Sequence, residues 1–209
     1  MTSKRPRLLD LFCGAGGAAV GYHRAGFKVV GVDIKPQNHF PFEFHQADAM
    51  TYPLEGFDVI HASPPCQHYS TCTPARYRGN HPDLIGAVRS RLQGKIYVIE
   101  NVLGARIKLI SPLVLCGSMF NLPIRRHRLF EINPELSALL PPCHHKKDPV
   151  YISGSTGSGN SKEGFRRVDF TIQERRDAMG CQWMTDKEID QAIPPAYTEW
   201  VGLQLMEVL

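Results

Sequence analysis

The 209-residue chain is 43% hydrophobic and 21% charged, the balance of a folded globular domain with a sizeable core. No apolar run reaches the ~20 residues of a membrane helix, and the basic stretch 1–7 passes directly into strand-like sequence. We therefore expect no membrane span and no signal peptide, and a cytoplasmic protein. A net charge of +4 only weakly favours a polyanionic partner. Six scattered cysteines without a CxxC pair favour reduced thiols.

The first sixth of the chain has the pattern of a nucleotide-binding unit. Residues 7–12 form an apolar run that predicts a strand, and Cys13 to Gly17 follow as a glycine-rich turn. A helix over 18–25 is predicted to end at Gly26, and 27–32 predicts a second strand with Asp33 at its end. This order predicts an α/β sheet, with Asp33 at the spacing where an acid meets ribose hydroxyls. A turn of this kind that holds no ligand is the alternative.

Three further strands each end at a reactive side chain. Residues 44–48 end in Asp48, residues 57–61 lead to Cys66, and residues 95–99 are followed by Glu100. In a parallel sheet the carboxyl ends of the strands lie along one edge, where ligands bind. We therefore expect these three side chains to converge with Asp33.

Cys66 follows two consecutive prolines, Pro64 and Pro65. Each proline fixes one backbone φ angle and removes one N–H donor. The chain thus leaves the preceding strand along a stiff path that presents the thiol. This placement favours a nucleophile, and an inert thiol is the alternative.

The rest of the chain predicts an extension of the same sheet and a separate insert. A polar loop over 67–80 is followed by a helix over 82–92, and strands are expected within 111–120 and 126–132. Residues 131–165, rich in Gly and Ser, are expected to form an insert. The residues on either side of it, 1–130 and 166–209, together form the catalytic portion. Three helices are expected in the last part of the chain. The first covers 171–179, the second begins at the capping box that starts with Thr185, and the third covers 197–209.

Several motifs together resemble the cytosine-5 DNA methyltransferase family. They are 10–17 (DLFCGAGG), 64–67 (PPCQ), 100–102 (ENV), 126–128 (RHR), 170–174 with 179–180, and 195–205. They occur in the family's order and span nearly the whole chain apart from about 131–165. The resemblance implies a Rossmann-like S-adenosylmethionine-dependent methyltransferase fold, a mostly parallel sheet with helices on both faces.

The resemblance implies S-adenosylmethionine as cofactor and double-stranded DNA as substrate. By this analogy Phe12 stacks near the adenine, Asp33 binds the ribose hydroxyls and Asp48 accepts from the adenine amino group. The turn from Gly14 to Gly17 lets the backbone approach the methionine portion. The full cofactor set expected is Phe12, Gly14, Ala15, Gly17, Asp33, Ile34, Asp48, Ala49 and Pro65.

The implied chemistry explains the catalytic residue types. Carbon 5 of cytosine is a poor nucleophile, and a thiolate that adds to carbon 6 makes it reactive. Cys66 suits this attack and a protonated Glu100 suits hydrogen bonding to ring nitrogen 3. Arg126 and Arg128 are expected to hold the ring carbonyl and the loop that carries Cys66. The base must leave the duplex, and the loop 67–80, with Arg76 and Arg78, is the expected lid.

The sequence also departs from the family pattern. Ile124 stands where glutamine usually opens the arginine motif, and Leu203 stands where asparagine usually follows Gly202. The interval for target recognition is too short for an independent domain. We therefore expect a compact monomeric enzyme with a short or relaxed DNA site, of a form that suits a phage or a restriction-modification system.

Four alternatives stay open from the sequence. The substrate could be RNA or a free nucleotide, the transferred group could be a substituted methyl, or the chain could be a non-catalytic DNA-binding homologue. Cys143, His144 and His145 could suggest zinc, but no partner stands at the spacing of a zinc motif. We therefore expect no metal.

Overall fold

A computed structural model describes residues 5–136, 140–145, 149–152 and 170–209. Its seven-stranded sheet has the order β3-β2-β1-β4-β5-β7-β6. The first five of these strands are mutually parallel, and β7 runs antiparallel to both β5 and β6. The strands are β1 (Arg7–Leu11), β2 (Lys28–Asp33), β3 (Glu43–Gln46), β4 (Val59–Ala62), β5 (Ile96–Asn101), β6 (Leu113–Leu115) and β7 (Arg128–Asn133). The prediction of a mostly parallel sheet is confirmed.

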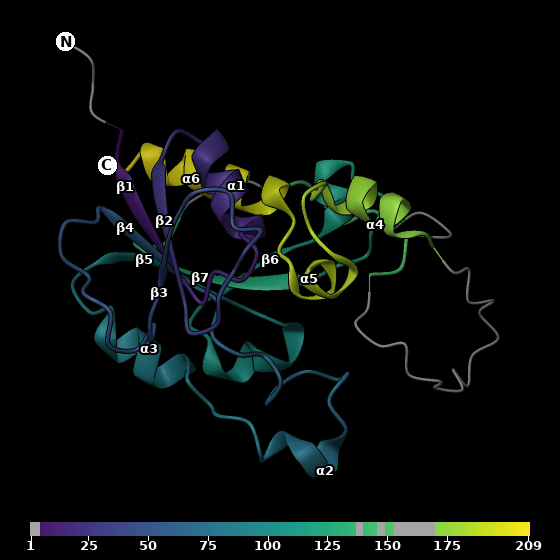
Figure 1. Ribbon diagram of the computed structural model, residues 1–209, viewed down its shortest axis with the longest axis horizontal. Helices are drawn as coiled ribbons and strands as arrows, with labels where there is room; N and C mark the ends of the chain where they lie inside the picture. The colour runs from purple at the N-terminus through teal and green to yellow at the C-terminus, as the bar shows by residue number, and fades with distance from the viewer. Residues whose placement is uncertain (1–4, 137–139, 146–148, 153–169) are drawn as a thin grey trace.

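Helices cover both faces of the sheet, as predicted. Figure 1 shows α1 and α6 on one side of the strands and α3 on the other. The helices are α1 (Gly17–Arg24), α2 (Ala75–Arg78), α3 (Ile85–Arg91), α4 (Ile172–Met179), α5 (Asp186–Gln191) and α6 (Pro195–Met206), with 3₁₀ turns η1 (Leu103–Lys108) and η2 (Gly117–Phe120). No helix in the described ranges is long and apolar enough to cross a membrane.

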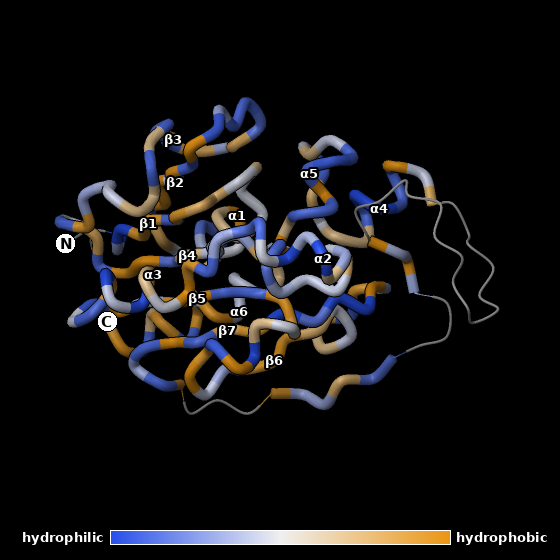
Figure 2. The backbone as a smooth tube through the Cα atoms, turned by 90° about the horizontal axis from the view of Figure 1, so that it is seen from below, coloured by the Kyte–Doolittle hydropathy of each residue, from blue (hydrophilic) through white to orange (hydrophobic). Residues whose placement is uncertain are grey.

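Strand alternation divides the core into two layers. Leu8 and Val59 pack with α1 and α6, whereas Leu9 and Ile60 pack with α3. Because successive strand side chains point to opposite faces, each central strand supplies both layers. Figure 2 shows hydrophobic residues gathered along the central strands, while α2 is more hydrophilic.

Two predicted boundaries are wrong in detail. The strand expected within 111–120 is only three residues long, because the chain turns into η2 at Gly117. The insert expected to begin at residue 131 begins later, because β7 continues to Asn133 and pairs there with Tyr97. The Gly/Ser-rich stretch of the insert lies outside the described residues.

Candidate active site

The parallel strands bring the predicted reactive residues to one edge of the sheet. Asp33 is the last residue of β2, and Asp48 follows β3 by two positions. Cys66 follows β4, and Glu100 is the second-to-last residue of β5. Since β2, β1, β4 and β5 run in the same direction, these ends lie side by side. The predicted convergence of three acids and a thiol is confirmed.

The turn after β1 is held open by the Asp33 carboxylate. Asp33 Oδ2 accepts from the Gly14 backbone N–H at 3.1 Å, and Oδ1 accepts from the Lys35 N–H at 2.9 Å. Phe12 and Gly14 have positive φ angles of 59° and 49°. A positive φ is costly for phenylalanine, and such strain gathers at ligand sites. A Cβ added to Gly14 would meet nothing within 4 Å, so this glycine faces open space.

The other residues of the turn are constrained by packing. A Cβ on Gly17 would lie 2.4 Å from the backbone oxygen of Ile193. The Ala15 carbonyl accepts from Trp183 Nε1 at 2.8 Å, and Ala15 itself is buried. The segment before α6 thus packs directly on the turn. Gly17 and Ala15 were predicted to bind the cofactor. Contacts within the chain are already enough to explain why small residues stand at these two positions.

The remaining predicted cofactor residues divide by exposure. Ile34 is 67% exposed beside Asp33, an unusual position for so large an apolar side chain. Asp48 is exposed, and its Oδ1 accepts from the Met50 N–H at 2.8 Å. Ala49 is buried in the core, whereas Pro65 is partly exposed. Ile34 and Asp48 thus offer free surface at this edge, and Ala49 offers none with its side chain.

Asp10 is a buried acid that the sequence reasoning did not assign to the site. It lies in the middle of β1 with 1% exposure, and neither carboxylate oxygen has a hydrogen-bond partner among the described residues. Burial, with the charges of Asp33 and Glu100, raises the pKa of Asp10 well above its usual value. An unpartnered acid in an apolar strand is the signal that could have identified it.

Cys66 sits in a turn that is fixed from two directions. Its carbonyl accepts from the backbone N–H groups of Tyr69 and Ser70, and Asn101 Nδ2 donates to the Pro64 carbonyl at 2.9 Å. Asn101 is itself buried at the end of β5. The ENV motif therefore anchors the proline-cysteine turn.

The pKa of the Cys66 thiol is raised above its ordinary value in this arrangement. Burial raises its pKa, and the charge of Glu100 raises it further. Arg128 and, more weakly, Arg126 lower it. The same three residues that neighbour the thiol thus control how much thiolate is present.

Glu100 is a buried acid paired with a single arginine. Its carboxyl is 5% exposed, and Arg128 Nε lies 3.1 Å from Oε1. Burial raises the pKa of Glu100, although Arg128, Ser63 and Arg126 oppose that rise. A carboxyl of this kind can hold a proton nearer to neutral pH than an exposed glutamate.

Arg126 does not join Arg128 in contacting the reactive groups. Its guanidinium donates to the carbonyls of Ala192, Ile152 and Asp190, at 3.0, 3.2 and 2.7 Å. The Arg126 carbonyl in turn accepts from the Tyr197 hydroxyl at 2.5 Å. The sequence predicts that the two arginines hold the ring carbonyl and the loop that carries Cys66, and in this structure Arg126 joins the end of α5 to the start of α6.

A second buried polar group lies beside the acids. His61 Nδ1 is 2.9 Å from the Tyr22 hydroxyl, and His61 Nε2 is 2.8 Å from Ser63 Oγ. Burial lowers the pKa of His61 to about 3, so the ring is neutral. His61 pairs with Asp10 in the register of β1 and β4. This histidine was also missed, because a single histidine in an apolar strand has no motif.

The loop over 67–80 projects from the body of the protein and carries α2 (Figure 1). Arg78 Nε donates to the Thr73 carbonyl at 3.0 Å, so that side chain is engaged within the loop. Arg76 is exposed, with its guanidinium 4.8 Å from the centre of the Tyr77 ring. Of the two predicted phosphate contacts, Arg76 is therefore the one that is free to reach a ligand.

Packing explains the departure from the family pattern at Ile124, whereas nothing in the structure explains the one at Leu203. Ile124 is 3% exposed and lies in a hydrophobic cluster with Met179 and Ile189. A glutamine there would place an amide among apolar side chains. Gly202 packs against α1, since a Cβ would lie 2.6 Å from that of Ala25, and Leu203 is 49% exposed on α6.

Comparisons with known proteins find DNA methyltransferases. Residues 6–106 match the model of the family described as C-5 cytosine-specific DNA methylase. The type II methyltransferase M.AplI of Arthrospira platensis is 27% identical over 190 residues, covering 71% of this chain and 53% of that protein. The chain thus spans about half the length of this curated relative.

Solved structures show the same fold. A DNA modification methyltransferase encoded within an E. coli prophage superposes with a TM-score of 0.50 and 26% identity, covering 71% of this chain and 53% of the other. The Entamoeba histolytica methyltransferase EhMeth gives a TM-score of 0.60 at 15% identity, with 98% of both chains covered. The S. pombe Dnmt2 methyltransferase gives 0.57 at 16%, covering 98% of this chain and 99% of that one. With the strand order, these matches confirm the Rossmann-like methyltransferase fold, and residues 6–106 are similar to the C-5 cytosine-specific DNA methylase family.

Proposed function

We propose that the chain transfers a methyl group from S-adenosylmethionine to carbon 5 of cytosine in DNA. The observation that carries this proposal is the buried Glu100 carboxyl. It is paired with Arg128, and its charge raises the pKa of the Cys66 thiol. The family match over residues 6–106 supports the same reaction. A nucleophile and a proton-holding acid at one sheet edge are what addition to a pyrimidine ring needs.

The residues beside the β1 turn fit the proposed cofactor. S-adenosylmethionine carries a sulfonium and an ammonium group, and Asp10 offers a buried carboxylate with no partner among the described residues. Gly14 faces open space, and Asp33 and the exposed Ile34 stand at the end of β2. Asp10 would therefore neutralise positive charge, Asp33 would bind ribose hydroxyls, and Ile34 would cover the adenine. When bound, S-adenosylmethionine supplies an electrophilic methyl group to carbon 5.

The chain's own residues perform the steps on the base. The Cys66 thiolate forms a bond to carbon 6, and the displaced electron pair reaches ring nitrogen 3, which takes the proton held by Glu100. Arg128 keeps the Glu100 carboxyl in place and stabilises the thiolate. After methylation, a water molecule accepts the carbon-5 proton, the freed electron pair re-forms the C5–C6 double bond and expels the Cys66 thiolate, and ring nitrogen 3 returns its proton to Glu100. Because carbon 6 is inaccessible inside a duplex, the base must be flipped into the site.

Covalent trapping tests this proposal directly. The protein is incubated with S-adenosylmethionine and either a duplex containing 5-fluorocytosine, a fluorinated transfer RNA, or fluorinated dCMP. An adduct on the duplex that requires Cys66 supports the proposal, with Cys72→Ala as the matched control because Cys72 is an exposed thiol six positions away. An adduct formed only on RNA or on the nucleotide contradicts the DNA substrate.

Bisulfite sequencing and nucleoside mass spectrometry complete the test. Unmodified duplex DNA incubated with the protein should gain protected cytosines, and the product mass should be that of 5-methylcytosine. A larger mass would indicate a substituted methyl group. Protection at no cytosine, from protein shown to bind the cofactor, would contradict catalysis.

A further inference from the structure

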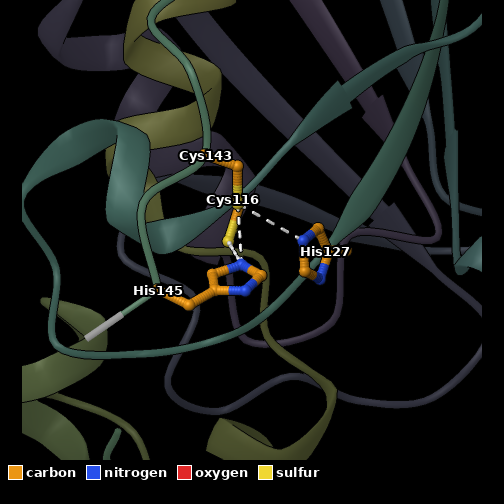
Figure 3. Close-up of side chains that lie close together, drawn as sticks. All are labelled: Cys116, His127, Cys143 and His145. Atoms are coloured by element: carbon orange, nitrogen blue, oxygen red, sulfur yellow. Dashed lines mark hydrogen bonds between the residues drawn. The ribbon is translucent and has the colours of Figure 1, made fainter. Parts of the chain in front are cut away.

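Four potential metal ligands converge outside the active site. Figure 3 shows the side chains of Cys116, His127, Cys143 and His145 pointing toward one another. Their two sulfur atoms and two imidazole nitrogens all lie within 4.8 Å of one another. Cys116 follows β6, His127 precedes β7, and the other two come from the segment 140–145. Three separate pieces of chain thus meet at one point.

The distances fit ligands that surround one ion. Cys143 Sγ lies 3.5 Å from His127 Nε2, and Cys116 Sγ lies 3.5 Å from His145 Nε2. Tetrahedral zinc with Zn–S near 2.3 Å and Zn–N near 2.0 Å separates sulfur from nitrogen by about 3.6 Å. The third such pair, Cys143 Sγ and His145 Nε2, is closer, at 2.7 Å. Of the four sulfur–nitrogen pairs, two therefore already have the separation that a tetrahedral site requires, and all four lie within 4.8 Å.

The donor set selects the metal. Two thiolates and two imidazoles in a tetrahedral arrangement are typical of Zn²⁺. All four positions are taken by protein side chains, so no position is open for water or substrate. A closed set of this kind is typical of a structural rather than a catalytic site.

One hydroxyl group lies beside both sulfur atoms. Ser118 Oγ lies 3.5 Å from Cys116 Sγ and 3.3 Å from Cys143 Sγ. A hydroxyl so placed can donate to a metal-bound thiolate, and such outer contacts orient the ligands. Cys116 is fully buried, whereas His145 is exposed. The cluster therefore joins a core position to the surface.

We propose that Cys116, His127, Cys143 and His145 bind one structural Zn²⁺ ion. The expectation of no metal rested on the lack of a partner for Cys143 in the sequence, and the structure supplies three. The ligands are 11, 16 and two positions apart along the chain. No two of them have the paired spacing of a zinc finger, so only the fold reveals the set.

This site would connect the short insert to the active site. His127 stands between Arg126, which holds the segment before α6, and Arg128, which pairs with Glu100. Arg128 Nη1 also donates to the His127 carbonyl at 2.9 Å. An ion on His127 would therefore fix the backbone from which Arg128 reaches Glu100, and it would fasten residues 143–145 beside it.

Metal analysis of the full chain tests the proposal. Protein purified with reductant and supplied with Zn²⁺ should hold about one zinc per chain by plasma mass spectrometry. Cys143→Ser and His145→Ala should each lower that content several-fold. His144→Ala is the matched control, because its imidazole lies between two proposed ligands in sequence but is not one of the four, and it should keep the zinc.

A second set of measurements uses the wild-type protein, so that it does not require any variant to fold. Cobalt-substituted wild-type protein should show the visible absorption of tetrahedral Co²⁺ with thiolate charge-transfer bands, and zinc X-ray absorption should give two sulfur and two nitrogen neighbours. Wild-type protein well below one zinc, equal zinc in Cys143→Ser and His144→Ala, or a Cys116–Cys143 disulfide in protein kept under reductant would each overturn the proposal. So would iron in place of zinc. None of these measurements depends on methyl transfer.

Discussion

Arg128 directs its Nε atom at the carboxyl of Glu100, 3.1 Å from Oε1, and both side chains are largely buried. The pairing lowers the cost of an ionised Glu100, yet burial still raises the pKa of the acid above its usual value. The acid is thereby kept available for proton transfer, while the guanidinium neutralises charge near Cys66.

Replacing the Glu100 carboxyl with an amide should abolish most of the proposed activity. Glu100→Gln keeps the shape of the side chain but cannot transfer a proton, so the single-turnover methylation rate should fall by about 10²–10⁴-fold. Glu199→Gln, which changes a partly exposed glutamate on α6 that pairs with Arg24, is the control. A Glu100→Gln rate within a few-fold of wild type would contradict the assigned role.

The reactivity of Cys66 should depend on its two charged neighbours. Because Glu100 raises the pKa of the thiol and Arg128 lowers it, Glu100→Gln should shift the pH profile of alkylation downward and Arg128→Ala should shift it upward. The measurement is the rate of iodoacetamide labelling of Cys66 against pH, by peptide mass spectrometry. Labelling of exposed Cys72 in the same digest should not change, and shifts of opposite sign at Cys66 would contradict the geometry.

The buried Asp10 carboxyl should lower the stability of the folded protein at high pH. Its folded-state pKa is raised, so the group favours folding below the usual aspartate pKa of about 4 and opposes it increasingly as the pH rises. Asp10→Asn should therefore raise the Tm at pH 8, and the gain should shrink as the pH falls toward 4.

The same variant should bind S-adenosylmethionine more weakly. The rise in Tm that saturating cofactor produces in wild type should be much smaller in Asp10→Asn, because a neutral amide does not attract the cofactor's positive charge. Thermal scans with and without cofactor provide both readings. An unchanged cofactor-induced shift would remove Asp10 from the site.

Arg126 and Arg128 should fail in different ways. Arg126→Ala leaves the carbonyls of Ala192, Asp190 and Ile152 without their donor, and should cost about 3 kcal/mol of unfolding free energy. Arg128→Ala should mainly lower the methylation rate, with a smaller change in stability. Chemical denaturation and single-turnover rates on both variants separate the two roles. Equal stability losses with equal rate losses would contradict the division.

The sequence by itself determined that the reactive groups follow the ends of strands. Apolar runs, the turn after residue 12 and the proline-cysteine pair predicted Asp33, Cys66 and Glu100 at the carboxyl edge of a parallel sheet. These features could be predicted because they depend on local backbone preferences and on short motifs. The ends of β6 and β7 could not, because strand length there is set by pairing between distant segments.

Only the tertiary structure decided what depends on distance through space. It bonded the Arg126 guanidinium to three backbone carbonyls, left Asp10 as a buried acid without a partner among the described residues, and explained Ile124 as part of a hydrophobic cluster. It also gathered Cys116, His127, Cys143 and His145, which share no motif in the chain. Metal ligands need to be close to one another in space, not in sequence, and only the folded chain measures that separation.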